Sequence, residues 1–349
     1  TENVVFDKNT TVAYVPSDTY TGDLKWETTS QFNVGVDLSL FNNRLRMTAD
    51  YYRKKTTDLL NNVEMPRSSG YTTALRNIGS IRNSGFELQL DGRIIDRAVK
   101  WDLGVNFSLN RSKVLVLSED KDIFGGELDN TILKDQLNLM RVGEPMYVFY
   151  GYVEDGYDEN GHIVYKNMDD DPAITAADKT IIGDPNPDFL VNLTTAVSYK
   201  GFTLSAFFQS SIGNDIYSLS MAAQAYDYGY NGNTLREVYY NHWTLENPTA
   251  KYPNLDQTSY KMSDRFVYDG SFVRLKNLEL AYDVPCARNK FIKRARVYVS
   301  AQNLFTITSY PFWDPDINAN GGGSSMIQGV DSYCYPSARI YTIGCRLTF

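Results

Sequence analysis

Nine separate segments of this chain alternate apolar and polar residues, and this pattern constrains the fold more than any other feature. In the first segment Phe32 and Val34 share one parity, while Asn33 has the other. Successive side chains of a β-strand point to opposite faces, so each segment is predicted to be a strand with one apolar and one polar face. A change of parity near Lys276 and Asn277 predicts a β-bulge. The nine predicted strands are Gln31–Leu40, Arg44–Tyr52, Gly85–Asp91, Trp101–Leu109, Phe189–Tyr199, Phe202–Ser211, Phe272–Tyr282, Arg296–Phe305 and Arg339–Phe349.

The connections between these strands alternate strictly between short and long. The short connections are 41–43, 92–100, 200–201 and 283–295, and the long ones are 53–84, 110–188, 212–271 and 306–338. A membrane β-barrel has this alternation because tight turns lie at one rim and large loops at the other. A soluble sandwich has no reason to keep it. The polar faces repeat Arg, Asp, Gln and Asn along whole strands, as a water-filled lumen permits.

The composition agrees with a barrel that crosses a membrane on strands. No run approaches the roughly 18 apolar residues that a membrane helix needs, although 42% of the 349 residues are hydrophobic. The chain carries 26 Tyr, 17 Phe and 4 Trp, and aromatic girdles are typical of membrane barrels. The net charge of −8 argues against a nucleic-acid partner, which favours a basic surface. We therefore predict an all-β transmembrane antiparallel barrel.

The number of strands shows that the barrel is incomplete. Single-chain bacterial barrels have an even number of strands and leave no open edge, so nine strands cannot close. We expect residues 1–349 to be one C-terminal portion of a larger barrel. If the connection 306–338 is external, the last strand descends to a periplasmic C-terminus and residues 1–30 lie outside the cell.

The last strand resembles the recognition strand of outer-membrane proteins, which the barrel-assembly machinery reads. It ends on an aromatic residue, and its apolar residues share one face. The residues of this predicted assembly signal are Tyr341, Ile343, Leu347 and Phe349. The resemblance implies that the chain lies in the bacterial outer membrane, in contact with its lipid and lipopolysaccharide.

Nine motifs along the chain support a more specific resemblance. They are DLKWETT (23–29), LFNNRL (40–45), DYYRKKTTDLL (50–60), NIGSIRNSGFE (77–87), IGDPNPDF (182–189), FQSSIGNDIY (208–217), WTLENP (243–248), SFVRLKNL (271–278) and VYVSAQNLF (297–305). In these motifs the chain resembles the SusC/RagA family of TonB-dependent outer-membrane transporters.

The resemblance implies a barrel of about 22 strands with a plugged lumen, of which these are the last nine. The plug domain and the TonB-contacting segment are absent from this sequence. It also implies active import of oligosaccharide or peptide nutrients, driven by TonB–ExbB–ExbD and assisted by a SusD-like surface lipoprotein. A passive porin-like channel and an outer-membrane adhesin or structural protein remain alternatives.

One acidic segment has the spacing of a calcium-binding loop. Calcium takes several oxygen ligands from a short turned loop, at positions 1, 3, 5, 7 and 12 in the EF-hand. Pro172 occupies the position where that loop has glycine, and an aspartate replaces the usual final glutamate. The segment is therefore interpreted either as a calcium site or as a solvated acidic loop. The predicted ligands are Asn167, Asp169, Asp171, the carbonyl of Ala173, and Asp178.

The long connections are rich in aromatic residues beside Asn and Asp. Aromatic faces with polar neighbours suit oligosaccharides, and apolar pockets with polar rims suit peptides. The alternative is that these rings pack the small cores of the loops. The residues predicted to bind substrate are Tyr228, Tyr230, Tyr239, Tyr240, Trp243 and Trp313. Helical signals at 218–225 and 234–243 place short helices in the same connection.

An enzyme is not indicated by the sequence. His162 and His242 are the only histidines, and they lie far apart along the chain. No nucleophile-elbow, zinc-protease or phosphate-loop motif occurs. We therefore expect neither a catalytic residue nor a cofactor other than calcium.

Overall fold

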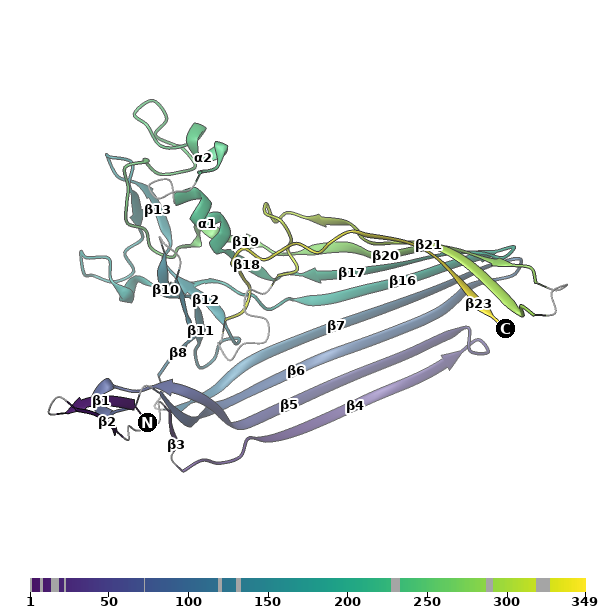
Figure 1. The fold of residues 1–349 in the computed structure, drawn as a ribbon, viewed down its shortest axis with the longest axis horizontal. Helices are drawn as coiled ribbons and strands as arrows, with labels where there is room; N and C mark the ends of the chain where they lie inside the picture. The colour runs from purple at the N-terminus through teal and green to yellow at the C-terminus, as the bar shows by residue number, and fades with distance from the viewer. Residues whose placement is uncertain are drawn as a thin grey trace.

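The computed structural model describes residues 2–6, 9–13, 19–21, 23–71, 73–118, 121–129, 133–226, 233–286, 291–317 and 327–349, with only the backbone described before residue 23. Its main feature is one large, curved antiparallel sheet (Figure 1). The strands follow one another in sequence order across the sheet, and each pairs with the next. They are β4 (Thr28–Leu40), β5 (Leu45–Glu64), β6 (Thr73–Asp96), β7 (Val99–Leu117), β16 (Phe189–Tyr199), β17 (Phe202–Ile212), β20 (Phe272–Val284), β21 (Arg294–Thr308) and β23 (Ile340–Thr348).

All nine predicted strands are confirmed, and so is the bulge. Between β20 and β21 the register shifts between Leu275 and Asn277, as the change of parity predicted. Within the described residues β4 and β23 each pair with one neighbour only, so the sheet has two open edges. A barrel cannot leave such edges exposed in lipid. The fold is thus the predicted all-β antiparallel barrel wall, present in part.

One predicted connection is wrong in extent. Most of 53–84 is strand, because β5 continues to Glu64 and β6 begins at Thr73. The sequence pattern ends earlier, since many residues beyond Tyr52 are polar on both faces, whereas backbone pairing needs no apolar face. Register shifts between Thr56 and Leu59 also break the parity that alternation relies on.

The two ends of the sheet differ, as the connection lengths predicted. At one end, which we call the turn end, β16 and β17 join through Lys200 and Gly201, both with positive φ. Two residues with positive φ form the tight hairpin turn that matches the twist of paired strands. The C-terminus lies at this turn end, and the long connections gather at the opposite end, which we call the loop end (Figure 1).

The two faces of the sheet also differ. An exposed apolar band crosses the strands on one side, which we call the apolar face. Large exposed hydrophobic surface marks contact with a membrane or another molecule. The described residues contain no helix that is long and apolar enough to span a membrane. Residues of the exposed band include Phe32, Val34, Val36, Leu38, Tyr51, Phe86, Val197, Phe202, Leu204, Leu280, Val297, Val299, Tyr341, Ile343 and Leu347.

The long connections fold into an assembly with its own core, which we call the loop assembly (Figure 1). Leu133, Phe149, Tyr217, Val238 and Phe266 are buried together there. The predicted helices are present as α1 (Leu219–Tyr226) and α2 (Arg236–Tyr240). The small strands of the loop assembly are β8 (Ile123–Phe124), β9 (Glu127–Asp129), β10 (Lys134–Gln136), β11 (Asn138–Met140), β12 (Val148–Gly151), β13 (Glu154–Tyr157), β14 (Ile163–Tyr165), β15 (Thr180–Gly183), β18 (Asp215–Ser218), β19 (Val267–Asp269) and β22 (Val330–Asp331).

Short elements complete the fold. Near the N-terminus, β1 and β2 form a hairpin, and β3 pairs in parallel with β6. Their bounds are β1 (Glu2–Phe6), β2 (Asn9–Ala13) and β3 (Thr19–Thr21), and the 3-10 helices are Arg67–Ser69, Ala176–Asp178 and Asp264–Phe266.

Candidate binding region at the loop end

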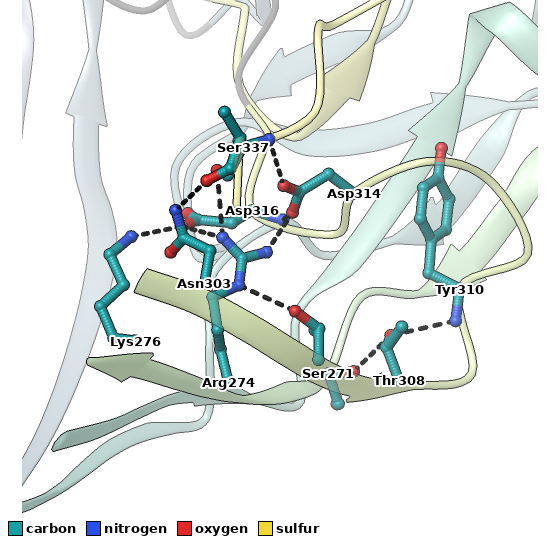
Figure 2. Close-up of polar contacts among 11 residues, drawn as sticks. Ser271, Arg274, Lys276, Asn303, Thr308, Tyr310, Asp314, Asp316 and Ser337 are labelled. Atoms are coloured by element: carbon teal, nitrogen blue, oxygen red, sulfur yellow. Dashed lines mark hydrogen bonds and ion pairs between the residues drawn. The ribbon is translucent and has the colours of Figure 1, made fainter. Parts of the chain in front are cut away.

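The last connection is fixed to the polar face of the sheet by one arginine. Arg274 of β20 has a side chain only 2% exposed, although it faces the side that alternation marks as polar. Its Nε donates to Thr306 Oγ1 of β21 at 2.9 Å, and its second terminal nitrogen donates to Asp314. The first terminal nitrogen donates to Ser337 Oγ at 3.2 Å. Figure 2 shows the guanidinium beside Asp314 and Ser337, and the Asp314 carboxylate compensates its charge.

Asp314 joins the two halves of this connection. Its carboxylate accepts the backbone N–H of Asp316 and that of Ser337, both at 2.9 Å, besides the bond from Arg274. Burial alone would raise the pKa of Asp314, but these N–H donors and the neighbouring guanidinium hold it below its usual value. Segments 309–317 and 334–338 are therefore held together on the sheet, and we call this unit the strap.

A second polar cluster ties the strap to the loop assembly. The buried hydroxyl of Tyr310 lies within hydrogen-bonding distance of two acceptors. They are Asp331 Oδ2 at 2.6 Å and Ser218 Oγ at 2.9 Å. Asp331 belongs to β22, which pairs in parallel with β18. The strap thus connects the wall of the sheet with the core that carries α1.

The structure separates the aromatic residues predicted to bind substrate. Tyr239 and Tyr240 of α2 are exposed and form an edge-to-face pair with ring centroids 5.2 Å apart. Trp313, in the strap, is 58% exposed and stacks on Phe312 at 4.9 Å. Trp243 is buried, since its ring packs on Gly161. Tyr228 and Tyr230 lie outside the described residues, and substrate binding by the set stays a prediction.

The predicted calcium loop is organised by its own side chains. Asp178 is buried and accepts the backbone N–H groups of Met168 and Thr175, at 2.7 and 2.8 Å. The bonds from Met168 and then Thr175 lower the pKa of its carboxyl. Asn167, Asp169 and Asp171 each accept a backbone N–H two residues ahead. Ala173 supplies one of these N–H groups and lies in the same turn.

Among the residues that the structure describes, no three His, Cys, Asp or Glu side chains are arranged to hold a metal ion. The acidic oxygens of this loop are used largely by its backbone. Calcium therefore stays a prediction.

The predicted assembly strand has its apolar residues on the surface. Tyr341, Ile343 and Phe349 are all more than two-thirds exposed, and Leu347 is exposed as well. They lie on β23 or directly after it, at one open edge of the sheet. This arrangement leaves them available to a partner, although recognition by the assembly machinery stays a prediction.

Sequence reasoning missed Arg274 and its partners. Arginines recur on the polar faces of several strands, so the position of Arg274 carries no distinguishing signal. The one local indication is the acidic pair Asp314 and Asp316 inside a long connection. That pair is separated from Arg274 by about 40 residues and meets it only because β20 and β21 are neighbours in the sheet.

An antiparallel wall with one apolar and one polar face, whose long connections pack together at one end, defines a section of a membrane β-barrel. Residues 7–304 match the family described as "TonB dependent receptor-like, beta-barrel". The chain belongs to this family, whose members are outer-membrane barrels.

Curated relatives and solved structures agree with the predicted SusC/RagA resemblance. TonB-dependent receptor P3 of Formosa agariphila is 33% identical over 96% of this chain and 35% of its own length. TonB-dependent receptor SusC of Bacteroides thetaiotaomicron is 29% identical over 94% of this chain and 32% of its own length. The structure of the RagAB peptide transporter superposes with a TM-score of 0.80 at 28% identity, over all of this chain and 38% of that one. The chain spans about a third of the length of these relatives.

Proposed function

We propose that the complete protein is an active, TonB-dependent importer of the outer membrane that takes up oligosaccharide or peptide nutrients. The observation that carries this proposal is the sheet itself, with an apolar face for lipid, a polar face for a lumen, and a packed loop assembly at one end. Membership of the TonB-dependent family supports the energy source. Catalysis has no part in the proposed function.

The proposed orientation places the loop end outside the cell and the turn end, with the C-terminus, in the periplasm. Short turns at the periplasmic rim and long loops outside are the rule for bacterial barrels. The apolar face then contacts outer-membrane lipid and lipopolysaccharide, and the assembly machinery reads the strand that ends at Phe349. TonB–ExbB–ExbD acts through a part of the protein that this chain does not cover.

We propose that α2 belongs to a contact surface for a SusD-like lipoprotein. Tyr239 and Tyr240 are 59% and 69% exposed, and nearby Leu245 is 85% exposed. Exposed aromatic residues that lie together are typical of protein interfaces. Tyr239→Ala/Tyr240→Ala should lower recovery of the lipoprotein in pull-down from outer membranes. The control Tyr335→Ala removes another ring that is 90% exposed and should leave recovery unchanged.

Uptake of labelled nutrient by cells with and without TonB tests the importer. We expect uptake to stop when TonB is deleted, while the protein stays in the outer membrane. Uptake that continues without TonB would instead support the passive channel. Surface binding without any uptake would support the adhesin.

A further inference from the structure

Three cations lie side by side on neighbouring strands of the wall. Lys55 of β5 pairs with Arg82 of β6, and Arg82 pairs in turn with Lys113 of β7. Neighbouring strands lie about 5 Å apart, so the three side chains leave the sheet within about 10 Å of one another. We call Lys55, Arg82 and Lys113 the basic row.

The basic row shares its side of the wall with the apolar face. Tyr51 and Phe86 are paired and belong to the exposed apolar band. Lys55 and Arg82 each lie an even number of positions from this pair, and the register between β5 and β6 does not shift over that stretch. Since every second side chain of a strand points to the same face, Lys55 and Arg82 point outward with the apolar band.

The residues beside the row show the same orientation from the other side. Ile81 and Val114, which adjoin Arg82 and Lys113 in the sequence, are buried together with Met140 of β11. Their neighbours in the chain must point the opposite way, away from this packed region. Lys55 and Lys113 are exposed, and Arg82 is half-buried. The basic row therefore lies on the outer surface of the wall.

No carboxylate balances the basic row. Within the described part of the chain, none of its three side chains forms an ion pair. Arg111, which has the same parity as Lys113, differs because it is paired with Asp188 at 2.7 Å. Like charges placed opposite each other destabilise a sheet, and the whole chain carries a net charge of −8. A row of uncompensated cations in an acidic chain indicates an anion from another molecule.

The row lies at the depth where lipid headgroups begin. β5 runs from the turn end toward the loop end, and its outward residues change from Tyr51 to the exposed cations Arg53 and Lys55 (Figure 1). The hydrocarbon layer ends where outward residues stop being apolar, and long basic side chains at that level reach into the headgroup layer. The anion expected here is therefore the phosphate of a lipid whose acyl chains lie on the apolar face.

We propose that the basic row and Arg53 bind the phosphates of lipopolysaccharide, an inference that rests on the proposed orientation of the importer and identifies where this lipid is held. In that orientation the loop end meets the outer leaflet, whose lipid A anchor carries both acyl chains and phosphates. The planar guanidinium of Arg82 donates two hydrogen bonds to one phosphate. Lys55 and Lys113 flank it as point charges, and Arg53 lies nearest to the acyl chains.

An acidic protein partner fits this surface less well. The cations continue directly into the apolar face at Tyr51 and Phe86, so a protein bound to the row would have to displace lipid from that face. A molecule whose anionic part is joined to an apolar part matches both surfaces at once. Lipid A has this structure.

Native mass spectrometry of the full-length transporter, purified from outer membranes and stripped of lipid in detergent, tests the site. The probes are diphosphorylated lipid A, dephosphorylated lipid A and phosphatidylglycerol. We expect diphosphorylated lipid A to bind most tightly of the three. Lys55→Gln/Arg82→Gln/Lys113→Gln should weaken its binding about a hundredfold, because each basic residue near an anionic lipid surface contributes about fivefold.

The matched control removes three cations from the polar face. Arg46→Gln/Lys54→Gln/Arg346→Gln changes exposed residues of opposite parity and should leave the binding of lipid A unchanged. A second variant, Lys55→Arg/Arg82→Lys/Lys113→Arg, keeps the charges of the basic row and should keep the binding. Heat-modifiable migration of each variant shows that the barrel has formed.

The outcomes separate this site from the import function. Equal binding of dephosphorylated lipid A, or unchanged binding by the glutamine variant of the basic row, overturns the phosphate site even where uptake still requires TonB. A preference for phosphatidylglycerol overturns the choice of lipopolysaccharide. Loss of the lipoprotein in pull-down, with lipid A binding retained, would instead assign the row to a protein. Phosphate-dependent binding that needs the basic row, together with uptake that ignores TonB, supports the site and overturns active import.

Discussion

Replacing Arg274 by methionine should release the strap from the sheet. The substitution keeps much of the side-chain volume but leaves the Asp314 carboxylate buried without its cation. Asp314 is 7% exposed and Arg274 is 2% exposed, so water cannot easily replace the lost partner. Removing one member of a buried ion pair typically costs about 3–5 kcal/mol. Because 1.4 kcal/mol corresponds to a factor of ten, the open form of the strap should become about 10² to 4 × 10³ times more populated.

Limited chymotrypsin digestion of the full-length protein in outer membranes measures this opening. The strap offers Phe312 and Trp313 as cleavage sites, whereas Pro311 protects the bond after Tyr310. When opening is fast compared with cleavage, the cleavage rate follows the population of the open form. Arg274→Met should therefore be cut in the strap about 10² to 4 × 10³ times faster than the parent protein.

Two variants decide whether the ion pair is the cause. Arg274→Met/Asp314→Asn removes both charges and should recover about 1–3 kcal/mol of the loss, because contacting residues couple by about that amount. The exposed Arg346, which also alternates onto the polar face, provides the charge control, and Arg346→Met should leave cleavage unchanged. Cleavage of Arg274→Met at the parent rate, or a double variant as sensitive as the single one, would refute this reasoning.

The same pair predicts how the strap responds to pH. The folded pKa of Asp314 lies below its unfolded value, so its contribution is complete above the unfolded pKa of about 3.9. The contribution is lost as the pH falls through the lower, folded pKa. Cleavage of the strap by an acid-active protease should therefore increase below about pH 4 in the parent protein. In Arg274→Met the dependence should be smaller, because one of the groups that lower the pKa is gone.

Four further expectations concern other parts of the molecule. Gly161→Ala should destabilise the loop assembly by about 1–3 kcal/mol in urea unfolding, because φ is +80° and the new Cβ would overlap the Trp243 indole. Asp178→Ala should lower the melting temperature by leaving two backbone N–H groups without their acceptor; equal melting with and without chelator would count against our proposal of calcium in this loop. A cysteine at Asn42 should react with a membrane-impermeant label only after the outer membrane is permeabilised, and labelling of intact cells would reverse the proposed orientation. Deleting Phe349 should reduce the amount of assembled barrel in outer membranes, and an unchanged amount would remove it from the assembly signal.

The sequence by itself determined the wall of the barrel. Period-two alternation depends only on the geometry of a strand between lipid and water, so Phe189–Tyr199 was predicted to its final residues. The same logic located the bulge beside Lys276, since a bulge shifts parity. It could not follow β5 past Tyr52, where many residues on both faces become polar and alternation carries little information.

Only the tertiary structure decided how the long connections are used. Trp243 and Trp313 looked equivalent in sequence, yet one is buried on Gly161 and the other is exposed beside a cavity. Arg274 and Asp314 carry no mark of their pairing, because its cause is the adjacency of β20 and β21 and the path of the strap, which follows β21. Local patterns record which side of a strand faces lipid, but contacts between distant loops depend on the register of the whole sheet.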